Sequence, residues 1–329
     1  MALLAFTLEC AAIAAFLGTG VSLLASGTFL VAKPLAQSWR PARRADFAFL
    51  LGMMPAIVTI AVVTAAAAPS VLGVLGLAND HCLSHQHHVH LCIVHSSGLR
   101  PVLATVGAFS LAVFLFRAVA LGKRAVETNK RLLLLERLGV REERRFPIVS
   151  LPGGPRLCHA VGILRRRILV SADLLVAIKR DELRAALAHE EAHLHRRDPA
   201  ALFGLSVAGL FAVPGIAQFL QSEFQEAVEE ACDAEAAVAV ADSPLVAAAL
   251  LKVAALQRRT PELGAVAPAF GESSLERRVH LLLRENDPQI SPARALLLAS
   301  VGATLGLALA LSLAPHLHHA VETALHQFF

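Results

Sequence analysis

The chain has 329 residues, of which 56% are hydrophobic and only 17% are charged, and its mean hydropathy is +0.59. This composition excludes an ordinary soluble globular protein and predicts an integral membrane protein. A pI near 9.0 would elsewhere suggest a nucleic-acid partner. Here the basic residues flank apolar segments, so we expect them to set membrane topology and expect no direct binding of nucleic acid. The five cysteines are too scattered for a disulfide framework.

Four apolar segments are predicted to cross the membrane: residues 11–32, 47–77, 101–121 and 295–313. Basic residues follow the first and third segments. By the positive-inside rule those sides are cytoplasmic, which puts a multi-pass protein in the plasma (inner) membrane with both termini outside. Arg117, near the end of the third segment, is expected to snorkel to the interface.

The expected fold is therefore mainly α, with three regions. Residues 1–122 contain three spans and a His-rich extracytoplasmic loop at 79–100. Residues 123–290 are predicted to form a cytoplasmic α+β domain, and residues 291–329 a fourth span followed by a short His-rich extracytoplasmic tail.

The main chemical signal is an H-E-x-x-H motif at residues 189–193, within a stretch predicted to be helical from 180 to 197. Histidines at i and i+4 project from one helical face about one turn apart, so His189 and His193 can reach one metal ion. Glu190 can then reach a metal-bound water. This pattern is typical of zinc hydrolases, although the bare pentad also arises by chance in charged amphipathic helices.

A catalytic zinc site normally has three protein ligands and an open position for water. Glu229 is the best candidate for the third ligand, on a second predicted helix that follows a break at Pro214-Gly215. Asp233 lies four residues further along the same face, where it can accept the second ring N–H of a zinc histidine. Asp198, just after the first helix, is a candidate for a similar role.

Residues 129–138 are predicted to form an amphipathic helix, and residues 146–151 and 167–171 two short strands. The second strand directly precedes the metal-binding helix. Zinc proteases often have a free sheet edge there, on which an extended peptide docks. A plain core strand explains the pattern equally well.

Residues 200–222 are apolar and uncharged, as in another span. A single crossing would put His189 and Glu229 on opposite sides of the membrane, and the segment is too short to cross and return. We therefore expect a helix broken at Pro214-Gly215 that is buried against the protease core or dips into the inner leaflet. The site should then lie close to the membrane surface.

The motifs together resemble the BlaR/MecR family of integral-membrane zinc metallopeptidases. The resemblance covers roughly residues 157–285 and rests on residues 157–171, 183–193, 197–198 and 229–233. It implies a zincin-like domain of the gluzincin type, in which His189, His193 and Glu229 bind one Zn²⁺ and Glu190 is the general base. It also implies signalling, in which an outside stimulus activates proteolysis and a cytoplasmic repressor of the BlaI/MecI type is lost.

Two features depart from that pattern. Members that sense β-lactams have a penicillin-binding domain after the fourth span, whereas here no S-x-x-K motif follows residue 313, so β-lactam acylation is not expected. Many zincins also stabilise the oxyanion with a tyrosine or histidine, and this chain has no tyrosine. His195, His159 or an arginine would have to serve, with His195 as the leading candidate.

The extracytoplasmic loop and tail contain ten of the fifteen histidines. Dense histidine with cysteine suits Zn²⁺ or copper ions, so a second metal could bind there and act as a signal. An adventitious His-rich loop, or a disulfide between two loop cysteines, remains open. The candidate ligands are Cys82, His85, His87, His88, His90 and Cys92.

Two other functions remain open at this stage. The first is a membrane quality-control protease resembling the HtpX family, which also uses an H-E-x-x-H motif. The second is a non-catalytic membrane receptor for metal that uses the outer histidines, against which the intact Glu190 argues. The expected partners are a peptide or protein substrate and membrane lipid, and homodimer formation is left open.

Overall fold

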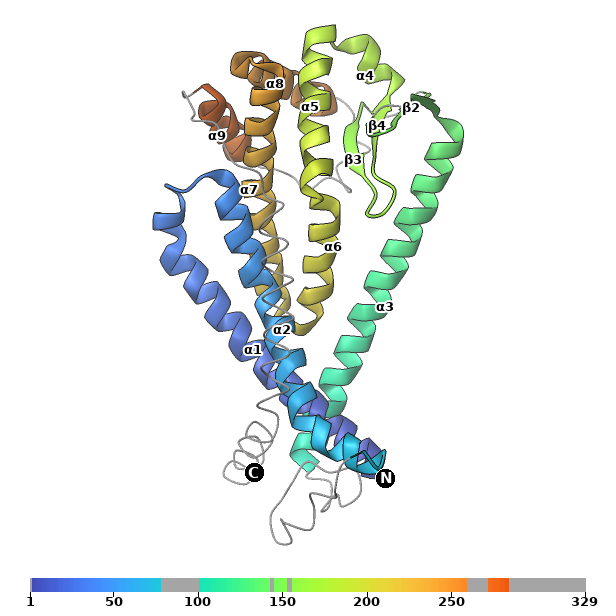
Figure 1. Cartoon of the computed structure of the whole chain (residues 1–329), viewed down its shortest axis with the longest axis vertical. Helices are drawn as coiled ribbons and strands as arrows, with labels where there is room; N and C mark the ends of the chain where they lie inside the picture. The colour runs from blue at the N-terminus through green and yellow to red at the C-terminus, as the bar shows by residue number, and fades with distance from the viewer. Residues whose placement is uncertain (1, 78–100, 143–144, 153–155, 259–271, 284–329) are drawn as a thin grey trace.

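The computed structural model describes residues 2–77, 101–142, 145–152, 156–258 and 272–283. Within these ranges the protein is mainly helical with one small sheet (Figure 1). The elements are α1 (Ala2–Ala36), α2 (Pro41–Val74), α3 (Pro101–Leu138), β1 (Val140–Glu142), β2 (Ile148–Leu151), β3 (Cys158–Val161), β4 (Arg167–Ser171), α4 (Ala172–Ala177), α5 (Arg180–Arg196), α6 (Asp198–Ala208), the 3₁₀ turn η2 (Gly209–Phe211), α7 (Pro214–Val240), α8 (Ser243–Arg258) and α9 (Glu272–Leu283).

Three of the described helices, α1, α2 and α3, are long and apolar enough to cross a membrane. They coincide with the first three predicted spans and make this a membrane protein. They converge at the end of the molecule away from the sheet (Figure 1). The fourth predicted span, the His-rich loop and the His-rich tail lie outside the described residues.

The third span is longer than predicted. α3 continues without interruption from Pro101 to Leu138 and so includes the separate amphipathic helix expected at 129–138. Gly122 is the glycine that lies between the two predicted helices, and a single glycine costs a helix only about 1 kcal/mol. Because β1 begins two residues after α3 ends, this helix leads directly from the membrane into the sheet.

The apolar segment at 200–222 forms two helices joined by a turn, and the break lies at 209–213, just before the predicted Pro214-Gly215. α6 ends at Ala208, η2 turns the chain, and α7 begins at Pro214. The turn packs against the middle of α1: a Cβ built on Gly18 would lie 2.1 Å from the carbonyl oxygen of Phe211. Only glycine permits this close approach.

Arg117 corrects another expectation. Its guanidinium does not snorkel to an interface; it donates hydrogen bonds to the carbonyl oxygens of Gly209, Leu210 and Ala212 at distances of 2.5–3.3 Å. These carbonyls lose helical partners where the chain turns between α6 and α7. Arg117 therefore joins the third span to the turn between the two helices.

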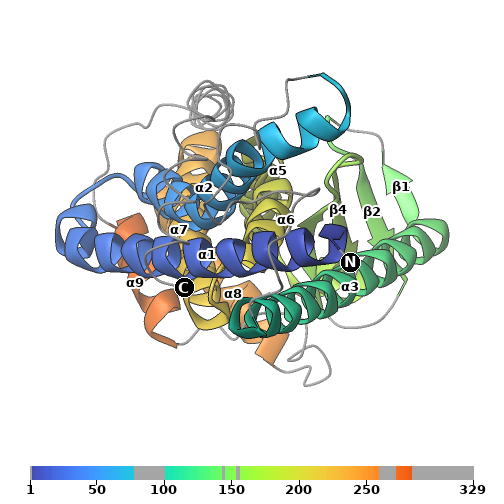
Figure 2. The same cartoon turned by 90° about the horizontal axis from the view of Figure 1, so that it is seen from below.

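The sheet has the strand order β1-β2-β4-β3. β2 and β4 are parallel with Ile148 opposite Ile168, while β1–β2 and β3–β4 are antiparallel. β4, the strand before α5, is thus an inner, fully buried strand, so the alternative of a plain core strand is the right one. The edge on that side belongs to β3, which the sequence did not predict as a strand. Figure 2 shows the sheet beside the far end of α3.

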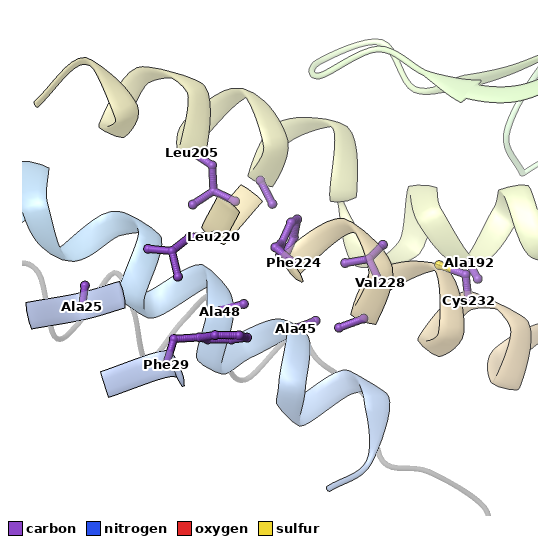
Figure 3. Packing of buried hydrophobic residues seen from close by; sticks show 12 residues of the cluster. Ala25, Phe29, Ala45, Ala48, Ala192, Leu205, Leu220, Phe224, Val228 and Cys232 are labelled. Atoms are coloured by element: carbon purple, nitrogen blue, oxygen red, sulfur yellow. The ribbon is translucent and has the colours of Figure 1, made fainter. Parts of the chain in front are cut away.

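The largest buried apolar cluster joins the spans to the globular part (Figure 3). Ala45 and Ala48 on α2 are almost completely buried, and these small side chains let α2 and α7 pack closely. Phe224 and Val228 of α7 fill the same cluster. The helix that contains Glu229 is thus packed directly on a membrane span.

Candidate metal centre and active site

Helix α5 presents both histidines of the motif. It begins after Lys179, whose backbone N–H donates to Glu182 at 3.0 Å, and it ends at Arg197 in a left-handed conformation with φ 62°. The prediction of a helix over 180–197 is therefore accurate to one residue. Asp198 and Pro199 start α6 immediately afterwards, and Asp198 is 3% exposed.

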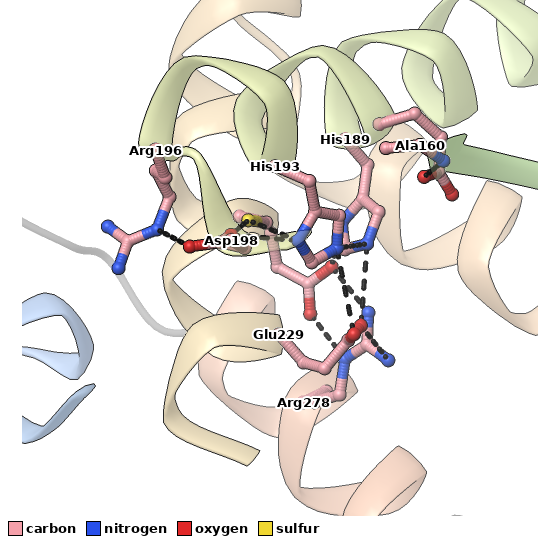
Figure 4. Close-up of polar contacts among 10 residues, drawn as sticks. Ala160, His189, His193, Arg196, Asp198, Glu229 and Arg278 are labelled. Carbon is pink, nitrogen blue, oxygen red and sulfur yellow. Dashed lines mark hydrogen bonds and ion pairs between the residues drawn. The ribbon is translucent and has the colours of Figure 1, made fainter. Parts of the chain in front are cut away.

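The structure brings His189, His193 and Glu229 together (Figure 4). The two Nε2 atoms lie 3.2 Å apart. The carboxylate of Glu229 reaches them from α7, with Oε2 3.4 Å from Nε2 of His189 and Oε1 3.6 Å from Nε2 of His193. Two ring nitrogens from α5 and the carboxylate oxygens of Glu229 from α7 therefore converge on one point.

These distances fit a tetrahedral zinc ion. Zinc bonds to nitrogen and oxygen of about 2.0–2.1 Å imply roughly 3.3 Å between ligand atoms at the corners of a tetrahedron. The two ring nitrogens, 3.2 Å apart, lie close to that separation, and each has one oxygen of Glu229 at 3.4 or 3.6 Å. Two imidazoles and a carboxylate also match the donor set of a catalytic zinc site with one open position.

The other ring nitrogen of each histidine faces a buried carboxylate. Nδ1 of His189 lies 2.9 Å from Asp233, and Nδ1 of His193 lies 2.9 Å from Asp198. Such contacts orient the ring and direct Nε2 toward the metal position. The thiol of Cys232 lies 3.5 Å from Asp198 and 3.4 Å from Nδ1 of His193, and desolvation by burial raises its pKa so that it stays neutral.

Arg278 on α9 balances the acidic side of this cluster. Its Nε and Nη2 atoms bond both oxygens of Asp233 at 2.6 and 2.8 Å, and its Nη1 atom lies 3.1 Å from Glu229. Burial alone would raise the pKa of Asp233, but Arg278 and His189 outweigh it and lower that pKa. The pKa of Glu229 is also lowered against burial, chiefly by His193 and His189. Both carboxylates are therefore anionic.

The carboxylates in turn favour positive charge on the histidines. Burial acts to lower the pKa of His189, but Asp233 and Glu229 raise it to about 10. Burial likewise opposes the charge on His193, whose pKa is nevertheless raised by Glu229 and Asp198. A site that holds protons this strongly is matched to a cation, and a metal ion would displace them.

Glu190 lies between the histidines and the sheet. It is 9% exposed, and its Oε2 atom accepts a hydrogen bond of 2.6 Å from the backbone N–H of Ala160 on β3. This N–H points away from β4 toward α5, so the free edge of the sheet faces Glu190. Both the edge strand and the acid next to the first histidine thus belong to the same site.

The remaining predicted residues are placed apart from this group. His195 is two residues beyond His193, on another face of α5, where it is exposed and packs against Phe146 with ring centroids 5.0 Å apart. Burial and Arg145 lower its pKa. His159 is exposed on β3. All the candidate ligands in the loop, from Cys82 to Cys92, lie outside the described residues.

Sequence reasoning missed Arg278 as a member of the site. The sequence offers one indication, an acidic pair, Glu229-Glu230, and a basic pair, Arg277-Arg278. In the structure these pairs face each other from α7 and α9, with Arg277 3.1 Å from Glu230. Glu230 is also bonded at 2.9 Å by Arg44 from α2, close to the end of that span. The contact of Ala160 with Glu190 had no such signal, because it depends on how the sheet docks.

Comparison with known proteins identifies the family of the chain. The family model described as BlaR1 peptidase M56 matches residues 102–282, more than half of the chain. No curated protein and no solved structure matches. The matched segment begins in α3 and ends in α9, so it includes every residue of the cluster around His189 and His193. The chain belongs to the BlaR1 peptidase family M56, a family of membrane metallopeptidases.

Proposed function

We propose that the protein is a zinc metalloendopeptidase in which His189, His193 and Glu229 bind one Zn²⁺. The observation that carries this proposal is the convergence of the two Nε2 atoms, 3.2 Å apart, with the carboxylate of Glu229, whose oxygens lie 3.4 and 3.6 Å from them. Glu190, next to the first ligand and at the sheet edge, is the general base. Asp233 and Asp198 orient the two rings.

The protein residues would divide the work of peptide hydrolysis as follows. A zinc ion held by the three ligands would supply Lewis-acid polarisation of the scissile carbonyl and lower the pKa of its water toward neutrality. Glu190 would accept the proton of the attacking water and deliver it to the leaving amine. For this step Glu190 would exchange its bond with Ala160 N–H for one with the water, which frees that N–H for the peptide.

The substrate is an extended peptide added to β3. The free edge of this strand faces Glu190, and main-chain hydrogen bonds to an edge strand bind extended peptides with little dependence on side chains. Side-chain selectivity would then come from the surroundings of β3, among which His159 is exposed.

The test uses the full-length protein in nanodiscs, with metal content measured by mass spectrometry and proteolysis measured on an unfolded substrate such as β-casein. Glu190→Gln should keep about one zinc per chain but reduce cleavage by 10²-fold or more, as expected for loss of a general base (about 10²–10⁴). Glu229→Ala should lose both zinc and activity.

Glu191→Gln is the matched control, because it makes the same chemical change one position along α5, on a face away from the ligands. It should keep zinc and activity. Cleavage that is indifferent to Glu190, or zinc content that is indifferent to Glu229, would overturn the proposed site.

We further propose that this protease is a signal transducer, with its globular part in the cytoplasm and a BlaI/MecI-like repressor as its target. Direct bonds between the spans and the segments around the site support this role: Lys33 of α1 pairs with Glu223, Arg44 of α2 pairs with Glu230, and Arg117 of α3 holds η2. Family membership favours it over an HtpX-like quality-control protease, and the position of Glu190 favours an enzyme over a non-catalytic metal receptor.

The signalling proposal is tested by co-expressing the protein with a winged-helix repressor of that type and following the repressor by immunoblot. Full-length repressor should disappear with the wild-type protein and persist with Glu190→Gln. An unchanged repressor beside an enzyme that cleaves casein would reject the signalling role and leave the peptidase intact. The histidines of the loop at 79–100 remain a proposed metal sensor. If a peptide of this loop binds metal no more tightly than micromolar, the sensor proposal is rejected.

A further inference from the structure

The turn between β3 and β4 exposes aliphatic side chains that have no role in the site. Leu164 is 94% exposed and Ile163 is 45% exposed, and the exposed Arg165 follows them. We call Ile163, Leu164 and Arg165 the hairpin tip. Aliphatic side chains next to a basic residue suit the boundary between lipid headgroups and acyl chains.

The geometry of the turn is well defined. Gly162 has φ +94°, and a Cβ at this position would lie 2.1 Å from the carbonyl oxygen of Arg165, so the turn requires glycine. The arginine after the tip points inward, with Arg166 bonded to the carbonyl of Leu194 at 2.8 Å. The tip side chains are therefore held outward by a folded base.

The base of the hairpin is anchored to the third span. Arg167, at the start of β4, forms a buried ion pair with Glu136 of α3. Leu132 and Leu135 of α3 pack against the apolar residues of β2 and β4. Since α3 is one continuous helix from the membrane to the sheet, the position of the hairpin relative to the bilayer is determined by this span.

The tip is directed toward the converging spans, α1, α2 and α3. In Figure 1 the turn between β3 and β4 is directed at the half of the molecule where the spans converge, and it lies at about the height of the loop between α1 and α2. Basic residues end the apolar part of each span, namely Lys33 near the end of α1, Arg40 in that loop, Arg43 at the start of α2, and Lys123 and Arg124 in α3. The tip is therefore level with the lipid headgroups on the protease side.

We propose that the hairpin tip is a lipid-binding element, with Ile163 and Leu164 inserted at the boundary of headgroups and acyl chains and Arg165 paired with anionic headgroups. Aliphatic side chains gain by leaving water at this depth, and each basic residue near the surface adds attraction to acidic lipid. β3, whose Ala160 contacts Glu190, is then held at the membrane surface. This inference does not depend on the chemistry of the metal site.

The experiment places an environment-sensitive fluorescent amino acid at Leu164 in the full-length protein in nanodiscs that contain lipids with a spin-label quencher near the headgroup. The matched control is the same label at Val176, which is 90% exposed on α4, at the end of the molecule away from the spans (Figure 1). The label at 164 should be quenched several-fold more strongly than the label at 176.

Two further arms identify the lipid and the competing occupant. Replacing phosphatidylcholine with phosphatidylglycerol should increase the quenching at 164, and Arg165→Ser should remove that increase. Equal, weak quenching at both labels would overturn the proposal. The proposal would also be overturned if the fluorescence at 164 is not quenched by lipid but changes when peptide substrate is added. The tip would then be assigned to substrate binding.

Discussion

Two arginines, the buried Arg278 at the metal centre and the partly buried Arg117 in the third span, are compensated in different ways. Arg278 bonds Asp233 and lies 3.1 Å from Glu229, so its one positive charge is shared between two carboxylates. Arg117 bonds three backbone carbonyls at η2, and no carboxylate is among its partners in the described part of the chain. Arg278 thus offsets part of the negative charge of the carboxylates around the metal site. Arg117 instead donates hydrogen bonds to backbone carbonyls where the helical hydrogen bonding is interrupted.

Removing Arg278 should have the largest effect on stability. Arg278→Ala leaves Asp233 and Glu229 buried together without their cation, and breaking such a pair typically costs about 3–5 kcal/mol. We expect this loss in thermal or denaturant unfolding of the metal-free protein, and a smaller loss when zinc is bound, because zinc supplies positive charge to Glu229.

Arg277→Ala is the control for this variant, since Arg277 is adjacent, more exposed and paired with Glu230. It should destabilise less than Arg278→Ala. If Arg278→Ala lowers the free energy of unfolding equally with and without zinc, this arginine does not offset the charge of the metal site.

Arg117→Leu should have a smaller but clear effect, because it leaves three carbonyls at η2 without donors. Hydrogen bonds to a charged donor contribute about 1.5–3 kcal/mol, so a loss on the order of 2 kcal/mol is expected in unfolding measurements. Unlike Arg278→Ala, its effect should not depend on zinc. Arg124→Leu, at an exposed position on the same helix, should change stability little.

Asp198→Asn tests the orientation of His193 without removing a ligand. Loss of a carboxylate that faces the second ring nitrogen typically weakens metal binding 10–100-fold, about 1.4–2.7 kcal/mol. Competition with a zinc chelator measures this change. An unchanged zinc affinity would mean that Cys232, the other neighbour of Nδ1, suffices to orient the ring.

The stability of the metal-free protein should also depend on pH. His189 has a folded pKa of about 10 against an ordinary value of 6.5. A raised folded pKa gives stability that is fully present below pH 6.5 and is lost as the pH rises toward about 10. Unfolding in EDTA across this pH range should show the loss of stability, and Asp233→Asn should make this loss smaller.

Calorimetry in buffers of different ionisation enthalpy should also detect proton release when zinc binds near neutral pH.

Much of the fold was predictable because it depends on local patterns. The length of each apolar run predicted three helices that match α1, α2 and α3, and the helix at 180–197 was right within a residue. β3 escaped prediction because four residues, Cys158–Val161, carry too little periodicity to mark a strand. The role of β4 as an inner strand depended on which strands pair with it.

For the candidate site, the sequence by itself determined that two histidines four residues apart share one helical face and that Glu190 is adjacent, because helix geometry is local. It also indicated Glu229 and Asp233 as a second pair at helical spacing. Only the tertiary structure brought Arg278 to Asp233, Ala160 to Glu190 and Arg117 to η2. These contacts join residues 30 to 95 positions apart, and no short-range periodicity encodes how helices and a sheet edge pack against one another.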